Sequence, residues 1–565
     1  MVEKHTAASP EQRESVLPPY VETASRASRH TIVIAILAFT IPLAIYLLRL
    51  DRVVGQFSDD AWYVLLAQAL ASGQGYTLIN SPSIGITPIY PPAFPILLSL
   101  AYRLMPEFPN NIWLLKSISI IAMLASGIFT YHYLNRYREL PRVLSLAAAL
   151  AVVLCPAFVF LATSTVMSEC VFTLGQLITV LTIERSLRIP SRRGWLYLLA
   201  GALLAAFSFL TRSMAVVLIL AIMIYLLKER QLGRTLLFTA VVALLTGPWL
   251  LYARLHEPTQ EQRQEQNNYI VQSYREQFWM RFAGVPVSGT ITAQELPARV
   301  WQNLTNIFAR NIGGIIVPSL YRDLPESGQE VSGMEDMGLT VGSKVISLVL
   351  SIIIVIGFVL TVGKQITLAE LLTLFTLIMV SVWPWWPLRF VLPLAPFLLF
   401  YLLMGLRAIV RLGLGRRKHI VYDQWFAPRI LIGCVIALSL YDHTGYLMAL
   451  HGYMEVAPPW VSIFKENEVM LQWADQRLLK NFAVAAQNPA LVYLYTGHKT
   501  IACDDPVGNW ENWKRLGVRY IVRTSIYALI DDDSARLVIY RSPTLNLRVV
   551  DLGPPATRPS ISMMR

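Results

Sequence analysis

Apolar runs of roughly 20 residues recur along this chain and constrain its fold more than any other feature. Eleven such runs are present, at 31–50, 111–134, 142–161, 169–187, 195–211, 213–227, 233–252, 344–363, 367–383, 388–408 and 427–449. A helix needs roughly 20 apolar residues to cross the hydrocarbon core of a bilayer. The sequence therefore predicts an α-helical polytopic membrane protein with about 11 transmembrane helices.

The composition supports a membrane protein and excludes other classes. Charged residues are 15% of the 565 residues and hydrophobic residues 55%, whereas soluble proteins contain about 25% charged residues. A soluble enzyme, a disordered chain and a collagen-like chain are therefore excluded. The four cysteines are far apart and form no C-x-x-C pair, so neither a zinc cage nor a disulfide scaffold is indicated.

The net charge of +12 is explained by the position of the basic residues. They gather in alternate loops, around 136–142, 185–193, 228–234, 364 and 407–418. Positive loops mark the cytoplasmic side of a membrane protein. This distribution predicts a multi-pass protein of the inner (plasma) membrane with a cytoplasmic N-terminus. It indicates contact with membrane lipids and no nucleic-acid partner.

This orientation divides the chain into a cytoplasmic tail (1–30), a membrane domain (31–450) and an extracytoplasmic C-terminal α/β domain (451–565). Two long outer loops, 51–110 and 253–343, interrupt the membrane domain. The second outer loop has 10 acidic and 7 basic residues, so it lacks the cytoplasmic bias. In the C-terminal domain we expect an amphipathic helix over 462–480, a helix around 508–516 and five short strands. The acidic run 531–533 is interpreted as an exposed turn.

The first outer loop predicts a helix that begins at Ser58 or Asp59, because either residue can cap it. Apolar residues then follow at helical spacing from Trp62 to Leu70, and Gly73 suits the C-terminal cap. We expect this helix to lie along the outer membrane surface, with 91–104 as a second surface or re-entrant helix. Lys116, near the start of the second span, is expected to snorkel to the interface.

A few ionisable residues lie at the outer ends of apolar segments. They are Asp59 and Asp60, Glu169 before the fourth span, and Arg212 at a turn between two spans. Charges at membrane depth are costly and usually functional. Carboxylates and arginines on one face suit an acceptor that loses a proton and a phosphate that must be held. On local sequence alone, Asp59 and Asp60 are explained equally well as helix caps.

Several motifs together resemble the GT-C membrane glycosyltransferases. They are DD-x-x-Y (59–63) with LASG (70–73), YPPAFP (90–95), the T-x-x-S-E acid (165–169), LTR (210–212) and GPWLLYAR (247–254). More narrowly, the set resembles the group of protein O-mannosyltransferases and aminoarabinose-lipid A transferases. NPALVYLYTG (488–497) and LGVRYIV (516–522) resemble the extracytoplasmic tails of its bacterial members.

The resemblance implies an enzyme that takes a sugar from a polyprenyl phosphate on the outer membrane face and transfers it with inversion to an acceptor hydroxyl. By this resemblance Asp59 would be the general base, and Asp60 would orient the acceptor or a cation. Glu169 would contact the acceptor or sugar, or support a metal. Tyr63 and Tyr90 would line the substrate site.

The resemblance also implies donor-phosphate contacts from Arg212 and Arg389. Arg389 stands in WWPLRFVLPLAPF (385–397), a basic-aromatic-x-x-Pro pattern, and snorkelling explains it equally well. Arg254 is a weaker phosphate candidate. Trp383, Trp385 and Trp386 predict an interfacial belt, although one of them could stack on a sugar.

One departure from the family pattern concerns a metal ion. Where the aminoarabinose enzymes carry Glu-Lys-Pro, this chain has Ile89-Tyr90-Pro91, so the acid that would supply a metal ligand there is missing. A divalent cation therefore remains a possible cofactor with unknown ligands. The inserted domain of eukaryotic protein mannosyltransferases is also missing, which does not favour a protein acceptor over a lipid or glycan.

Two other functions remain open at the level of sequence. A transporter or lipid-linked sugar flippase should show an inverted repeat and polar residues at mid-span, and neither is found. A membrane scaffold whose outer domain binds a partner would use the outer acids only as helix caps.

Overall fold

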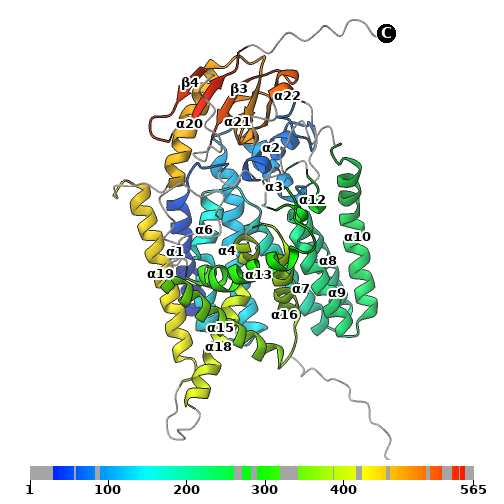
Figure 1. Cartoon of the computed structure of the whole chain (residues 1–565). Coiled ribbons are helices and arrows are strands. Elements are labelled where there is room, and N and C mark those ends of the chain that lie inside the picture. The colour runs from blue at the N-terminus through cyan, green and yellow to red at the C-terminus, as the bar shows by residue number, and fades with distance from the viewer. Residues whose placement is uncertain are drawn as a thin grey trace, which may run out of the picture.

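The computed structural model of the chain describes residues 29–55, 59–82, 89–259, 270, 272–281, 289–317, 341–385, 387–414, 423–453, 459–503, 510–524, 537–545 and 547–553. Three features of the sequence, Ser58, Trp386 and the acidic run 531–533, lie outside these residues. The described chain is mostly helical, with a bundle of long helices below a small sheet (Figure 1).

Each of the eleven predicted apolar runs forms helix. In chain order these are α1 (Arg29–Arg49), α4 (Ile112–Arg136), α5 (Arg142–Val153) with α6 (Pro156–Thr163), α7 (Glu169–Arg188), α8 (Arg192–Thr211), α9 (Val216–Lys228), α10 (Leu232–Leu255), α15 (Val341–Val362), α16 (Leu368–Val382), α18 (Ala395–Leu414) and α19 (Phe426–Leu450). Within the described residues, seven helices are long and apolar enough to cross a membrane, and the bent pair α5–α6 makes an eighth. The prediction of a polytopic helical membrane protein is confirmed.

Prolines interrupt the regular α-helical structure at two places, with a bend at the first and a 3₁₀ turn at the second. α5 and α6 meet at an angle of 47°, where Pro156 begins α6 and has no N–H for a helical hydrogen bond. Before α18, the short helix α17 (Pro387–Val391) and the turn η7 (Leu392–Leu394) precede the long helix. The second break matters for function, because Arg389 is part of α17.

The first outer loop forms α2 (Asp59–Ala71) and α3 (Ala93–Leu104), as predicted. The position of α2 along the outer membrane surface stays a prediction, but the structure shows that other parts of the protein cover this helix. Residues 60–67 and Ala69 are all buried, because α3 and α21 (Pro489–Thr496) both contact α2. The C-terminal domain thus covers the face that the sequence alone would leave exposed.

The second outer loop contributes α12 (Tyr274–Trp279), α13 (Leu296–Asn306), the π-helical turn η4 (Ile307–Asn311) and α14 (Ile312–Ile316). Figure 1 shows α12 near α3, at the end of the bundle that faces the sheet. This placement brings residues of the second outer loop beside residues of the first.

The C-terminal domain is a five-stranded sheet with helices, as predicted. Its elements are α20 (Pro459–Arg477), β1 (Ala483–Ala486), α21, β2 (Thr500–Ala502), α22 (Trp510–Arg515), β3 (Val518–Arg523), β4 (Leu537–Arg541) and β5 (Arg548–Asp551). The strand order is β2-β1-β3-β5-β4. β1 is parallel to β2 and β3, whereas β5 is antiparallel to β3 and β4.

Those basic turns of the bundle that the structure describes lie away from this sheet. α8 runs from Arg192 to Thr211, and Arg212 follows it at the end of the bundle that carries α2 and α3. Arg192 and its neighbours are therefore at the opposite end, about 30 Å away for a helix of 20 residues.

Candidate active site

Asp59 is the first residue of α2, where the helix dipole favours a negative charge. Its Oδ1 accepts a hydrogen bond of 3.0 Å from the Tyr90 hydroxyl. Its Oδ2 forms a salt bridge of 3.1 Å with Nη2 of Arg389. The side chain keeps 17% of its surface exposed, so this carboxylate is both held in place and accessible.

Asp60 has a different environment, although it is the next residue. Its side chain is fully buried, and its Oδ2 accepts a hydrogen bond of 2.8 Å from the backbone N–H of Gly55. Asp60 is not among the residues that line the cavity beside Asp59. The carboxylate of Asp59 therefore faces the cavity, whereas the carboxylate of Asp60 binds the backbone of the preceding segment.

Glu169 joins the two predicted arginines. It is the first residue of α7 and is fully buried. Its Oε1 lies 3.0 Å from Nη1 of Arg212 and 2.9 Å from Nε of Arg389. Because Arg389 also contacts Asp59, the four side chains form one chain of opposite charges with no net charge.

Breaks in the helices place both arginines in this cluster. α8 ends at Thr211, and Arg212 follows in an extended conformation before a short 3₁₀ turn. Its Nη1 also donates a hydrogen bond of 3.2 Å to Ser168 Oγ. Arg389 is in the proline-bounded α17. The structure therefore does not support snorkelling as the explanation of Arg389, whose guanidinium is bound to carboxylates.

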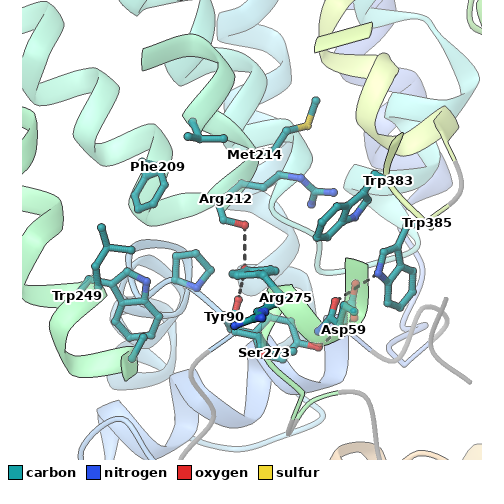
Figure 2. A pocket seen from close by; sticks show the side chains of 18 of the residues that line it. Asp59, Tyr90, Phe209, Arg212, Met214, Trp249, Ser273, Arg275, Trp383 and Trp385 are labelled. Atoms are coloured by element: carbon teal, nitrogen blue, oxygen red, sulfur yellow. Dashed lines mark hydrogen bonds between the residues drawn. The ribbon is translucent and has the colours of Figure 1, made fainter. Parts of the chain in front are cut away.

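A cavity of about 1000 Å³ opens beside these residues. Figure 2 shows Phe209 and Trp249 on one side of it, and Trp383 and Trp385 on the other side, near Asp59. The predicted residues among its lining are Asp59, Tyr63, Tyr90, Arg212, Arg254 and Arg389. Tyr63 and Tyr90 also pack edge to face, with ring centroids 5.1 Å apart. One part of the wall is apolar and includes Val216, Leu250 and Met379.

The second outer loop supplies residues that the sequence did not single out. The Tyr274 hydroxyl donates a hydrogen bond to the carbonyl of Ile89 and accepts one of 2.8 Å from Ser213 Oγ. Tyr274 thus connects three segments around the cavity. A sequence signal existed, because Ser273 and Glu276 form a capping box that predicts the start of a helix.

Trp383 and Trp385 are fixed by contacts with other outer segments. The side-chain amide of Asn303 donates hydrogen bonds to the carbonyls of Ser381 (3.0 Å) and Trp383 (2.8 Å) at the end of α16. Trp385 Nε1 donates to Gln277 Oε1 at 3.3 Å. Both indoles therefore belong to the wall of the cavity that Asp59 also lines.

The residues described by the structure do not include a group of three or more His, Cys, Asp or Glu side chains that could hold a metal ion. Asp59 and Glu169 instead contact guanidinium groups. At the position where the sequence departs from the aminoarabinose enzymes, the Tyr90 hydroxyl contacts Asp59.

Comparisons with known proteins agree with this fold. Residues 90–252 match the family model described as dolichyl-phosphate-mannose-protein mannosyltransferase. This segment contains Tyr90, Glu169 and Arg212. No curated protein sequence matches the chain.

Solved structures with similar folds include ArnT from Cupriavidus metallidurans bound to undecaprenyl phosphate. It has a TM-score of 0.55 and 14% identity, and covers 92% of this chain and 98% of ArnT. The archaeal oligosaccharyltransferase AglB from Archaeoglobus fulgidus, in complex with an inhibitory peptide and a dolichol-phosphate, has a TM-score of 0.53 and 14% identity. This match covers 88% of this chain and 70% of AglB.

The fold is therefore of the class shared by ArnT and AglB, a GT-C-like fold as the sequence motifs predicted. Within that class, the segment 90–252 resembles the mannosyltransferase family that uses a lipid-phosphate sugar.

Proposed function

We propose that this protein is an inverting glycosyltransferase that moves a sugar from a polyprenyl-phosphate donor to an acceptor hydroxyl on the outer face of the cytoplasmic membrane. One observation carries the proposal: an accessible carboxylate, Asp59, is bound by Arg389 and shares with Arg212 a large cavity that also has an apolar lining. The fold and the matched family supply the reaction class.

Arg212 and Arg389 are the residues proposed to bind the donor phosphate. A guanidinium stays charged near lipid and can bind a phosphate through two parallel hydrogen bonds. Phe209, Val216 and Leu250 lie along the same cavity and suit the first isoprene units. Similar proteins were solved with undecaprenyl phosphate and with a dolichol-phosphate, which supports a donor of this chemistry.

The proposed reaction is a single displacement. The acceptor oxygen attacks the anomeric carbon, the new C–O bond forms, and the bond to the phosphate oxygen breaks. The acceptor proton passes to Asp59, and the electron pair leaves with the polyprenyl phosphate, whose charge Arg212 and Arg389 stabilise. Attack opposite the leaving group inverts the anomeric configuration.

The other members of the cluster have positioning roles in this proposal. An aspartate carboxylate is a weak general base, so the rate depends strongly on how the acceptor and the donor are positioned beside Asp59. Glu169 lies behind the two arginines and fixes their separation. Tyr90 fixes the orientation of the Asp59 carboxylate through Oδ1.

The charge distribution supports the proposed outer-face location. The basic turns are at the end of the bundle away from the cavity, and cytoplasmic loops carry the excess of Lys and Arg. The cavity and the C-terminal domain are then extracytoplasmic, and the N-terminus is cytoplasmic.

The direct test uses purified protein, native membranes as the source of acceptor, and polyprenyl-phosphate sugars labelled in the sugar. We expect the label to enter a lipid, glycan or protein fraction with the wild-type protein, and transfer to fall at least 100-fold in Asp59→Asn. Asp475→Asn is a matched control, because Asp475 is exposed on α20, outside the site.

Full transfer by a normally folded Asp59→Asn variant would contradict the proposed base. Movement of the labelled lipid across sealed vesicles, undiminished in Asp59→Asn and without label in any acceptor, would instead favour a flippase.

A further inference from the structure

Segment 51–55, which leads into α2, is held by the helix bundle at its first residue. Lys116 Nζ is fully buried and donates hydrogen bonds of 2.8 Å to Asp51 Oδ1, to the Asp51 carbonyl and to the Thr163 carbonyl. Ser164 Oγ donates to Asp51 Oδ2 at 2.6 Å. The expectation that Lys116 snorkels is wrong, because a carboxylate and two carbonyls satisfy its ammonium group inside the protein.

The last residue of this segment, Gly55, is held by the C-terminal domain. Its carbonyl accepts a hydrogen bond of 3.0 Å from Nδ2 of Asn488. Its N–H donates to Asp60 Oδ2 at 2.8 Å. A Cβ atom at this position would lie 2.9 Å from Leu491 Cδ2, and the φ of +91° favours glycine. Glycine therefore lets the C-terminal domain approach the backbone that binds Asp60.

Asn488 has its side chain fixed by a second contact. Its Oδ1 accepts from the backbone N–H of Leu491 at 3.1 Å and caps α21. The amide therefore has one orientation, with Oδ1 toward α21 and Nδ2 toward Gly55. The side chain is 6% exposed, so water competes little for either hydrogen bond.

The C-terminal domain also contacts the chain after α2. Lys499 Nζ donates to the Ile79 carbonyl at 2.7 Å. Asn80 exchanges two hydrogen bonds with Thr500, one from its side chain (2.9 Å) and one to its carbonyl (2.8 Å). The domain thus holds the segment that carries Asp59 both before and after the helix.

We propose that the C-terminal domain sets the position of Asp59, and that Asn488 is a positioning residue for sugar transfer. The inference rests on the proposed function of Asp59 as the base. The connection runs from Asn488 to Gly55, from Gly55 to Asp60, and from Asp60 to the first turn of α2. A displacement of 1 Å at a reacting group can cost a rate factor of about 100, so these two hydrogen bonds are enough to affect turnover.

Asn488→Asp tests this connection with little change to the fold. Aspartate is as good a helix cap as asparagine, so α21 keeps its cap. The variant loses the donor to Gly55, because an ionised carboxylate cannot donate a hydrogen bond. Asp475→Asn, in the same domain and outside the contact, is the matched control.

Two measurements are needed on each purified variant. The first is backbone hydrogen exchange over residues 51–66, together with the unfolding temperature and the affinity for undecaprenyl phosphate. The second is transfer from the labelled donor. For Asn488→Asp we expect several-fold faster exchange at residues 55–62, and kcat lower by about tenfold or more. Undecaprenyl phosphate affinity and KM for the donor should stay unchanged, because Glu169 on α7 holds both Arg212 and Arg389 through contacts that do not involve α2.

The outcomes separate this inference from the proposed function. Unchanged exchange at 55–62, or an unchanged kcat, in Asn488→Asp would overturn the positioning role. A fall in kcat that accompanies loss of lipid-phosphate binding or of the unfolding transition would also overturn it, since that pattern indicates general damage. Faster exchange in a protein whose wild type transfers no sugar would support the connection to α2 and contradict the proposed function.

Discussion

At the scale of single residues, the sequence predicted those members of the candidate site that are ionisable residues in apolar surroundings. Asp59, Glu169, Arg212 and Arg389 stand out because ionisable groups are rare in apolar surroundings and costly there, and the structure joins them. Tyr274 was not predictable in the same way. The chain has 25 tyrosines, and nothing in the sequence marks the one that reaches the carbonyl of Ile89.

Arg389→Lys tests the geometry of the charge cluster. Lysine keeps the positive charge, but a single ammonium cannot reproduce a guanidinium that contacts Asp59 through Nη2 and Glu169 through Nε. We expect transfer to fall by about 10- to 100-fold while the protein stays folded. Steady-state kinetics with the labelled donor measure the loss. Wild-type rates in Arg389→Lys would show that only the charge matters.

Tyr90→Phe tests the hydrogen bond to Asp59 Oδ1. A hydrogen bond from a neutral donor to a carboxylate contributes about 1.5–3 kcal/mol. The variant loses this hydrogen bond, and part of the lost free energy should raise the activation barrier. We therefore expect transfer to fall about 3- to 30-fold, measured as kcat with saturating donor. Tyr540→Phe, on strand β4, is the control. Equal kcat values for Tyr90→Phe and Tyr540→Phe would contradict a role of the Tyr90 hydroxyl in catalysis.

At the scale of elements, the length of the apolar runs predicted which segments are helical, but it did not predict which helices are buried inside the protein. All eleven runs became helix, because 15–25 apolar residues leave few alternatives. The burial of α2 was missed, because its cover comes from α21, more than 400 positions later in the sequence. The spacing of apolar residues within α2 cannot show that a segment so distant in the sequence packs on it. For the same reason the contact of Asn488 with Gly55 could not be predicted.

His498, just before β2, gives the C-terminal domain a predicted pH dependence. The ring is buried, and burial lowers the pKa of His498 below its usual value near 6.5. The folded state therefore binds fewer protons than the unfolded state once the pH falls below about 6.5. We expect the free energy of unfolding to decrease from that pH downward.

The measurement for His498 is the unfolding temperature at several pH values between about 5 and 8. His498→Gln removes the titrating group and should flatten the profile in this range. His451→Gln is a matched control, because His451 is exposed at the end of α19. Parallel profiles for the wild-type protein and His498→Gln would mean that other groups cause the pH dependence.

At the scale of the whole molecule, the proposed reaction depends on which side of the membrane the cavity faces. Much of the positive charge lies in basic turns. The basic turns that the structure describes are at the end of the bundle opposite α2 and the sheet, and this pattern predicts a cytoplasmic face there. Single cysteines on a Cys434→Ser background test the prediction, because Cys155, Cys170 and Cys503 are buried.

Asp475→Cys reports on the C-terminal domain, and Arg230→Cys reports on the turn between α9 and α10. Both positions are exposed. A membrane-impermeant maleimide should label Asp475→Cys in intact spheroplasts, and Arg230→Cys only after permeabilisation. The reverse pattern would put Asp59 on the cytoplasmic side. A donor made on that side would then reach the cavity without crossing the membrane, so the labelling result decides whether a flipped lipid-linked sugar is required.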